Sequence, residues 1–308
     1  MQSAIARLQR YLATSDLQRC LAVVRHKAWR VQRLSNLVES VVCVDIGAAH
    51  FPHPKWWLFL QSPNTHWLAV DPAAESLRYV EQWKWKSSIK ALPVAVSAGT
   101  GTRTLHVTNS PTGSSLLRPR ASLRNDYRYS PQDLSYFFPT TDLLLETISL
   151  DSMLAQFGQE CRFVLKLDIQ GSEFEVLTSL ASMFDGRKIL AVESEVSLLH
   201  SPPYENAPRL WDVVSLMEQR GFELLQLDII EKIISSRSRS ERGIIAEADA
   251  VFVLRRELVM NLELTARLQL LCVFVTYRLF DEARSMLRDD QELADFIRNS
   301  PTSGRFSI

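Results

Sequence analysis

The sequence predicts an α/β fold built on a parallel β-sheet. From residue 41 onward, short apolar runs alternate with segments of helical periodicity, a pattern typical of βαβ units. The runs lack regular polar alternation, as expected for strands that helices cover on both faces. A chain of 308 residues buries about three quarters of its unfolded surface, so the fold needs no disulfide or metal ion to hold it together.

The first elements are helices, and strands follow them. Residues 3–39 carry apolar side chains at helical spacing, with Asp16 as an internal cap, and predict two amphipathic helices. The apolar runs then begin and are separated by helical patterns. They predict buried strands at residues 41–47, 65–72, 89–97, 162–171 and 188–196.

A long interruption separates the third of these strands from the fourth. Residues 99–110 predict a turn and an extra strand, and residues 111–142 predict a loop rich in Ser, Pro and Arg. Loops longer than about 15 residues are usually functional or disordered. The loop contains a local basic patch of Arg118, Arg120, Arg124 and Arg128. The patch either binds an acidic or phosphorylated acceptor or is a solvated surface of a mobile loop. No Lys or Arg occurs from 129 to 161, so electrostatic recognition is expected to be local to the loop.

The last third of the chain predicts two more strands and a helical tail. A proline-containing loop at 200–208 precedes a helix over Leu210 to Arg220, which Gly221 ends. The predicted strands span residues 222–229 and 249–256, and helical patterns continue from residue 257. We expect three regions, namely an N-terminal helical segment (1–40), one central domain (41–255) and a C-terminal helical tail (256–308).

The composition excludes several classes of protein. Lys plus Arg and Asp plus Glu number 35 each, so the net charge is zero and no basic surface indicates nucleic acid or an anionic membrane. Arg267 and Arg278 interrupt the longest apolar stretch, which falls short of the roughly 20 residues of a membrane span. The first twenty residues lack the apolar core of a secretory signal. Because the cysteines (Cys20, Cys43, Cys161 and Cys272) form no CxxC pair, a reducing, cytoplasmic location is expected.

The first candidate site residues follow the strand at 41–47. Asp45 and Gly47 come at its carboxyl end, where open α/β sheets bind ligands. Gly47 lets the backbone approach a ligand closely, because it has no Cβ atom. The later glycines of a GxGxxG motif are missing, which disfavours NAD or FAD. An ordinary tight turn between a strand and a helix is the alternative interpretation.

Asp71 ends the next predicted strand, 24 residues after Gly47. An acidic residue about 20 residues beyond the glycine turn accepts hydrogen bonds from ribose hydroxyls in folds of this kind. With Pro72 at the first helical position, a helix cap is the alternative role for Asp71.

Asp168 comes at the end of the strand at 162–171 and is the strongest single candidate for a functional carboxylate. Ser172 and Glu175 fit a capping box, so Glu175 is expected to be structural. Glu173 lies in the first helical turn, where the helix dipole favours an anion.

Several strings, taken in this order, resemble the FkbM family of S-adenosylmethionine-dependent methyltransferases. They are VDIGA, LAVDP, ISLDSML, LKLDIQGSEFEVL and VESEVSLLHSPPYENAPRLWDVVSLMEQRGFELLQL. Residues 165–177 reproduce the family's LK-x-D-(V/T)-(E/Q)-G-x-E hallmark almost throughout, and the resemblance covers about residues 41–255. GSSLL at 113–117 also resembles a serine-rich segment of many relatives.

The resemblance implies a Rossmann-like class I methyltransferase, with a doubly wound, mostly parallel seven-stranded sheet and flanking N- and C-terminal helices. It implies S-adenosylmethionine as cofactor, with Asp45, Gly47 and Ala48 near its methionine part. It also implies that Asp71 holds the ribose diol, that Ala95 and Ser97 border the adenine, and that Asp168 faces the methyl group and the acceptor.

An oxygen acceptor would need a general base, because a sugar hydroxyl is a poor nucleophile. The candidates are Asp168, Glu195 and His200. Glu193 and Glu195 share one strand face, and one of them is expected to pair with a buried lysine such as Lys166. No metal is expected. The metal-site alternatives are His50 and His53 with Asp71, or Asp168 with Glu195 and His200.

The expected function is O-methylation of a sugar, glycan or other polar small molecule, and the preference for oxygen rests on the family analogy alone. The segment AAHFPHP follows Gly47 where the family usually has Asn or Arg and then a glycine. That departure motivates an alternative, a non-catalytic binding or scaffold protein that keeps the fold. A nucleotide-sugar enzyme that uses NAD is a weaker third interpretation, which the missing GxGxxG disfavours.

Overall fold

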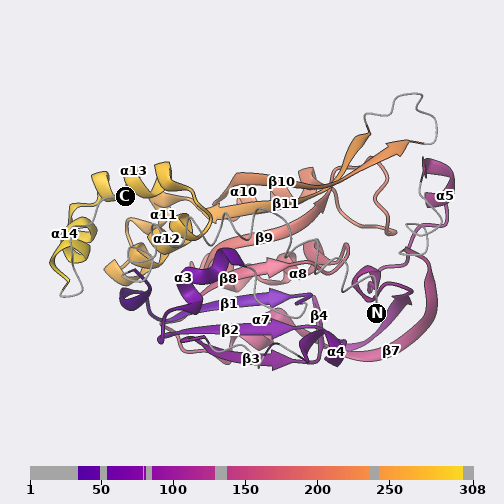
Figure 1. Ribbon diagram of the computed structural model, residues 1–308, viewed down its shortest axis with the longest axis horizontal. Coiled ribbons are helices and arrows are strands. Elements are labelled where there is room, and N and C mark those ends of the chain that lie inside the picture. The colour runs from indigo at the N-terminus through magenta and orange to yellow at the C-terminus, as the bar shows by residue number, and fades with distance from the viewer. Residues whose placement is uncertain are drawn as a thin grey trace.

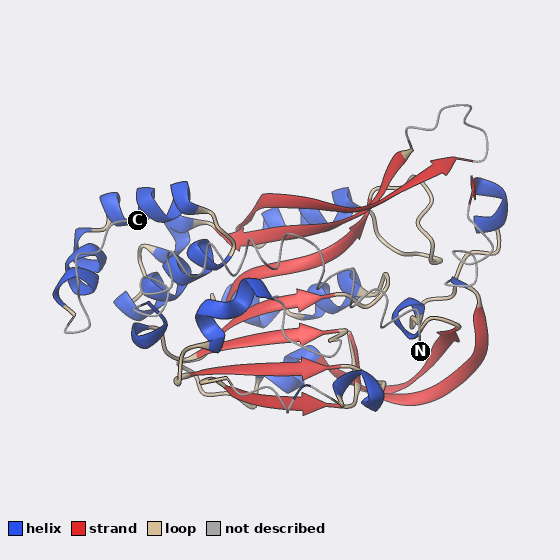
Figure 2. Ribbon diagram, viewed as in Figure 1, coloured by secondary structure: helices blue, strands red, loops and turns tan. Residues whose placement is uncertain are grey.

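The computed structural model describes residues 34–48, 54–78, 80, 85–128, 137–235 and 243–300. These residues form an α/β fold with a large, mostly parallel sheet and helices (Figures 1 and 2), as the sequence predicts. Of the two predicted N-terminal helices, residues 34–37 are helical and residues 1–33 lie outside the described part of the chain.

The main sheet has eight strands in the order β3-β2-β1-β8-β9-β11-β10-β6. Its first five members run parallel, and β11 is antiparallel to both β9 and β10, so the sheet is mixed. The prediction had seven strands, and the two-residue β6 adds an eighth. The strands are β1 (Val41–Ile46), β2 (Thr65–Val70), β3 (Ser88–Leu92), β6 (Tyr127–Arg128), β8 (Arg162–Leu167), β9 (Ile189–Ser197), β10 (Phe222–Ser235) and β11 (Ile244–Leu254).

Continuous apolar runs explain the central strands. Every residue of β1 is buried, and β2, β8 and β9 are nearly as enclosed. The chain adds β2 and β3 on one side of β1 and β8 and β9 on the other, so the direction of winding reverses between β1 and β8. In open α/β sheets, ligands bind at the carboxyl edge of the sheet beside such a reversal.

A second sheet of three strands forms beside the first, in the order β4-β7-β5. It contains β4 (Ala95–Ser97), β5 (Gly101–Thr108) and β7 (Pro139–Ser149). The single strand predicted at 89–97 is wrong, because the chain leaves the main sheet at Pro93, which has no N–H group for a ladder. The predicted extra strand at 99–110 is β5, whereas β7 begins inside the segment predicted to be a loop.

The antiparallel edge extends beyond the rest of the sheet. The strand predicted at 222–229 continues to Ser235, and β10 and β11 form a long hairpin (Figure 1). The predicted helix that Gly221 ends is present, and Gly221 has a φ of +86°. This positive φ favours glycine immediately after a helix.

Helices and helical turns fill the remaining connections. Figure 2 shows α3 in front of the main sheet and α7 behind it. The elements are η1 (Pro54–Trp56), α3 (Trp57–Leu60), α4 (Ala74–Leu77), η3 (Pro111–Gly113), α5 (Leu123–Asp126), α7 (Leu150–Leu154), α8 (Glu173–Ser179), α9 (Ala181–Asp185), α10 (Leu210–Gln219), α11 (Arg256–Val259), α12 (Leu264–Thr276), α13 (Phe280–Asp289) and α14 (Gln291–Asn299).

The C-terminal helices share the hydrophobic core of the main sheet. Buried side chains of α12, α13 and α14 belong to the same cluster as β1, β8 and β9. Within the helical tail predicted from residue 257, α13 and α14 separate at Asp290, which caps α14 by accepting from the Leu293 N–H at 3.0 Å. In Figure 1 these helices lie beyond the amino ends of the parallel strands, opposite the edge where the strands end.

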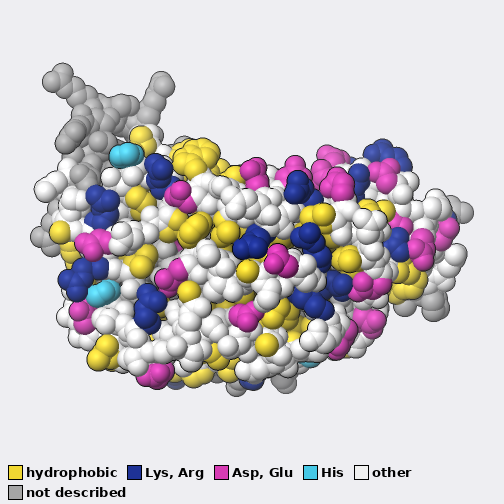
Figure 3. All heavy atoms as spheres, turned by 180° about the vertical axis from the view of Figure 1, so that it is seen from behind, with side chains coloured by type: hydrophobic (Ala, Val, Ile, Leu, Met, Phe, Trp, Pro, Cys, Tyr) yellow, Lys and Arg dark blue, Asp and Glu magenta, His cyan; other side chains and the backbone are white. Residues whose placement is uncertain are grey.

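Two further expectations concern the surface and the cysteines. None of the helices in the described part of the chain has the length and apolar composition that a bilayer crossing requires. The face in Figure 3 intersperses basic with acidic side chains, in keeping with the net charge of zero. Cys43, Cys161 and Cys272 are buried free thiols, and Cys20 lies outside the described residues.

Candidate functional site

The turns after β1 and β8 meet at the reversal of the sheet. Gly47 has a φ of +83°, and a Cβ atom on it would lie 1.9 Å from the backbone oxygen of Asp168. The Asp168 N–H donates to the Ile46 carbonyl at 3.0 Å, and the Gly47 N–H donates to the Val70 carbonyl at 2.9 Å. Gly47 is therefore required at this close approach of two backbones, and it brings the ends of β1, β2 and β8 together.

Asp45 is a buried carboxylate with an unsatisfied atom. It is 4% exposed, and its Oδ1 has no hydrogen-bond partner among the described residues. Burial raises the pKa of Asp45 to about 6, against the opposing charge of Lys166. A buried carboxylate oxygen without a partner is costly, so it marks a position where a ligand would supply a donor.

Lys166 lies beside Asp45 and Glu193 in the register of β1, β8 and β9. Its Nζ donates to Asp168 Oδ2 at 3.0 Å. Burial opposes the charge of Asp168, yet the adjacent Lys166 ammonium brings the pKa of that carboxyl below its usual value. Burial likewise opposes the charge of Lys166, and three carboxylates together raise its pKa. Lys166 thus bonds to Asp168, while Glu193 pairs with Lys55 of η1.

Asp71 follows β2, at the same edge of the sheet. Its Oδ1 accepts from the Ala73 N–H at 2.7 Å, so the carboxylate holds the turn before α4. Burial raises the pKa of Asp71 to about 6, against the lowering effect of that backbone hydrogen bond. The side chain is half-buried, and the helix-cap alternative is wrong, because α4 begins at Ala74 after the N-cap residue Ala73 and leaves Asp71 and Pro72 outside the helix.

The remaining predicted cofactor residues lie at this sheet edge and on the second sheet. Ala48 is buried, and its N–H donates to the Val70 carbonyl at 3.2 Å. Ala95 and Ser97 belong to β4, which pairs with β7 rather than with the main sheet. Ser97 Oγ donates to the Gly99 carbonyl at 2.6 Å and to Thr147 Oγ1 at 3.0 Å, so its hydroxyl already serves the local fold.

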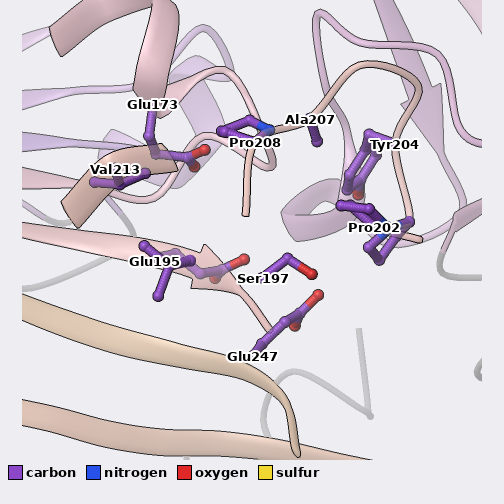
Figure 4. A pocket seen from close by; sticks show the side chains of 12 residues that line it. Glu173, Glu195, Ser197, Pro202, Tyr204, Ala207, Pro208, Val213 and Glu247 are labelled. Atoms are coloured by element: carbon purple, nitrogen blue, oxygen red, sulfur yellow. The ribbon is translucent and has the colours of Figure 1, made fainter. Parts of the chain in front are cut away.

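A small cavity of about 20 Å³ opens between β9, β11, the start of α8 and the loop at 202–208. Glu195 and Ser197 of β9 and Glu247 of β11 lie together on one side of it, Glu173 lies opposite, and Tyr204 closes a third side (Figure 4). This volume is close to the space that one water molecule occupies. It suits a single hydroxyl-sized group of a ligand.

The carboxyl groups that line this cavity have raised pKa values. Burial, followed by the Asp168 charge, raises the pKa of Glu195 well above its usual value. Burial and Glu231 raise the pKa of Glu247 to about 8, and burial raises the pKa of Glu173 to about 7. Perturbed carboxyl groups beside a cavity are characteristic of functional sites.

The predicted capping box at the start of α8 is wrong. Ser172 makes no capping hydrogen bond, and its buried Oγ has no partner among the described residues. The carboxylate of Glu173 instead turns back and accepts from the Ile169 N–H at 2.8 Å. Glu175 lies 3.5 Å from the Arg103 guanidinium on β5. Glu173 therefore stabilises the turn after β8, and the Ser172 side chain does not cap α8.

Gln170 is a site residue that the sequence argument missed. Its side-chain amide lies between Asp168 and Glu195, and Tyr204 Oη donates to its Oε1 at 3.0 Å. Its position within the family hallmark was the signal available in the sequence. The partners that reveal its role are distant in sequence.

The long segment before β7 is bound to the loop after β9. The Arg120 N–H donates to the Pro203 carbonyl at 2.8 Å, and the Glu205 N–H donates to the Arg118 carbonyl at 2.8 Å. The start of the predicted loop is therefore joined to the 202–208 loop that lines the cavity. The Arg118 side chain is exposed and Arg120 is half-buried, whereas the side chains of Arg124 and Arg128 lie outside the description.

The structure does not bring His200 into this group. His200 is exposed and does not line the cavity. His50 and His53 lie outside the described residues. Across the described ranges, no three His, Cys, Asp or Glu side chains come together in an arrangement that could hold a metal ion.

Comparisons with known proteins identify the family. The methyltransferase FkbM domain matches residues 45–224 of the 308. A search of curated proteins finds no match. Among solved structures, precorrin-6y C5,15-methyltransferase from Geobacter metallireducens GS-15 is similar, with 9% sequence identity and a TM-score of 0.29. The similarity covers 74% of this chain and 87% of that chain, and at this TM-score it supports no conclusion about function. Because the FkbM domain spans more than half of the chain and includes Asp45, Asp71, Asp168 and Glu195, this protein belongs to the FkbM methyltransferase family.

Proposed function

We propose that this protein is an S-adenosylmethionine-dependent methyltransferase that methylates a hydroxyl group of a polar small molecule such as a sugar. The observation that carries the proposal is the meeting of Asp45, Gly47 and Asp168 at the sheet reversal, with a buried oxygen of Asp45 that has no partner in the described chain. The strand order β3-β2-β1-β8-β9-β11-β10 supports a doubly wound class I methyltransferase fold. Cytoplasmic location remains part of this proposal.

The residues present fit the cofactor. Asp45 Oδ1 is available to accept from the amino group of the methionine part, and the Gly47 turn leaves no Cβ in the crevice. Asp71, whose Oδ1 accepts from the Ala73 N–H and whose carboxyl group also hydrogen-bonds with the Ser76 side chain, is the proposed partner of the ribose hydroxyls. Ala48, Ala95 and Ser97 complete the proposed cofactor side. When bound, S-adenosylmethionine supplies an electrophilic methyl group for in-line attack by the acceptor oxygen.

Asp168 is the proposed general base. Lys166 keeps its carboxylate ionised despite burial, so it can accept the hydroxyl proton of the acceptor. Glu195, whose raised pKa favours the protonated form, hydrogen-bonds to Asp168 beside it and is the proposed donor of the pair. Two neighbouring carboxyl groups in opposite protonation states provide an acceptor and a donor in one site. His200, exposed and away from the cavity lining, is not needed for this chemistry.

The cavity favours an uncharged, hydroxyl-bearing acceptor. The pKa of Glu247 is about 8 and that of Glu195 lies well above its usual value, so both carboxyl groups favour the neutral form, which can donate to and accept from hydroxyl groups. Tyr204 and Ser197 add hydroxyl groups to the lining. Orientation within such a site, with water excluded, contributes about 7 to 11 kcal/mol to rate acceleration in favourable cases.

A transfer assay tests the proposal. The full chain is incubated with S-adenosylmethionine carrying a radiolabelled methyl group and with panels of neutral sugars, amines and carboxylic acids. We expect label in hydroxyl-bearing acceptors at a rate at least tenfold above that in amines or acids of similar size. Label confined to amines or acids would contradict the oxygen preference. Cofactor binding without transfer to any panel would support the alternative of a non-catalytic protein that keeps the fold.

A further inference from the structure

We propose that Gln170 is a positioning residue that fixes the Asp168 and Glu195 carboxyl groups relative to each other and to the acceptor wall at Tyr204. The inference rests on the proposed function, in which Asp168 receives a proton and Glu195 keeps one. Gln170 does not need to touch substrate for this role. It acts through the two carboxyl groups that do.

The side-chain amide of Gln170 uses both of its polar atoms. Nε2 donates to Asp168 Oδ1 at 3.3 Å and reaches the two Glu195 oxygens at 3.3 and 3.4 Å. Oε1 accepts from the Tyr204 hydroxyl at 3.0 Å. A glutamine amide has two donor hydrogens and one acceptor oxygen, so a single planar group can bond all three neighbours.

The backbone of Gln170 is equally constrained. Its carbonyl accepts from Ser115 Oγ at 2.7 Å, and the single Tyr204 hydroxyl hydrogen is shared between Gln170 Oε1 and the Gly113 carbonyl, which lies 2.9 Å from Tyr204 Oη. These bonds tie the turn after β8 to the segment before β7 and to the loop after β9. The Asp168–Glu195 pair is thereby held against the cavity wall from two directions.

Gln170 adopts an unfavourable backbone conformation to reach this position. It is 7% exposed and has a φ of +57°, in the left-handed region that residues other than glycine rarely occupy. Such strain persists where surrounding contacts enforce it, and it clusters at functional sites. The following residue, Gly171, has a φ of +101°, so the strained turn spans both positions.

The charges around Gln170 explain why an amide suits this position better than a carboxyl group. A glutamate here would lack the donor that Asp168 and Glu195 share and would add another acid to a crowded acidic region. Lys166 and Lys55 are the cations that face this region within the described chain. The acids that face it are Asp45 on β1, Asp168 on β8, Glu173 on α8, Glu193 and Glu195 on β9, Glu231 on β10, and Glu247 and Asp249 on β11.

The test follows the side-chain carboxyl resonances of Asp and Glu by NMR during a pH titration of the full chain. Gln170→Met removes the amide at similar volume, and we expect the pH at which Asp168 titrates to rise by about one unit, a tenfold change in proton affinity. The double variant Gln170→Glu with Glu195→Gln exchanges the amide and the carboxyl group. It is expected to bring the Asp168 titration back toward the wild-type value.

The following results would confirm or overturn the positioning role of Gln170. An unchanged Asp168 titration in folded Gln170→Met would overturn the proposal, since a merely structural glutamine would not set that titration. If Gln170→Met does not fold, failure of the exchange variant to restore a wild-type titration overturns it instead. S-adenosylmethionine affinity, measured in parallel, should stay within twofold of wild type. Absence of cofactor binding in the wild-type chain would refute the proposed function while leaving the titration test intact.

Discussion

Replacing Glu173 by Gln should stabilise the protein at neutral pH. Glu173 is 2% exposed and lines the cavity, and its ionised carboxylate can accept hydrogen bonds but cannot donate them. Burial raises the pKa of Glu173 from 4.5 to about 7. Glutamine has nearly the same shape and keeps an acceptor oxygen for the Ile169 N–H. The substitution therefore removes the cost of burying a charge while retaining the turn.

The size and sign of the effect follow from linkage. Because the folded state holds the Glu173 proton more tightly than the unfolded state, the wild-type free energy of unfolding falls as the pH rises from 4.5 to 7. A difference of about 2.5 pKa units corresponds to about 3 kcal/mol. The Glu173→Gln variant has no titrating group at this position, so its free energy of unfolding does not fall in this way. Its advantage should be near zero at pH 4.5, grow through the interval, and remain constant above pH 7.

Urea unfolding at several pH values between 4.5 and 8, followed by circular dichroism, measures the difference. Glu175→Gln is the matched control, because it removes a charge from the same helical turn at a side chain that is 32% exposed. The control should change the free energy of unfolding by less than about 1 kcal/mol. Equal stability of Glu173→Gln and wild type at pH 7.5 would refute the reasoning about the buried charge.

The other predictions concern the cofactor side and the fold. Asp71→Ala should weaken S-adenosylmethionine binding about 10- to 100-fold in calorimetry, since a hydrogen bond to a charged group contributes about 1.5–3 kcal/mol. The control variant Glu75→Ala, at an exposed neighbouring residue, should bind the cofactor like wild type. Wild-type cofactor affinity in Asp71→Ala would rule out the ribose role of Asp71. Asp168→Asn should lower turnover by about 10²–10⁴-fold at nearly unchanged cofactor affinity, and unchanged turnover would remove Asp168 from the mechanism. Gly47→Ala should lower the unfolding midpoint severely or prevent folding, because its Cβ would meet the Asp168 backbone, whereas Gly99→Ala has open space and should behave like wild type.

The sequence was most informative where burial is continuous. Strands β1, β2, β8 and β9 are apolar runs enclosed on both faces, so their positions could be predicted from the chain alone. The strand β7 escaped prediction because most of its side chains are exposed, including Leu143 and Leu144. Its partner β5 lies across the second sheet, and such pairing leaves little local signal in the sequence.

The candidate site also has residues that could be predicted from the sequence and residues that could not. Asp45, Gly47, Asp71 and Asp168 could be selected because each lies near the carboxyl end of a predicted strand, and parallel strands end at one edge of a sheet.

The acceptor side could not be selected by this rule. Glu247 comes from the antiparallel β11, where the carboxyl-end rule does not apply, and its alternating strand has no distinctive motif. Gln170 depends on Tyr204 and Ser115, which are 34 and 55 residues away in sequence. His200 was chosen for its residue type next to a proline loop, but the chain leaves it exposed.

The most direct test of the account is calorimetric titration of S-adenosylmethionine into the full-length wild-type chain at pH 7.5. The account predicts saturable binding of one cofactor per chain, because Asp45, Gly47 and Asp71 meet at the reversal of the sheet. No detectable heat at millimolar cofactor would contradict it.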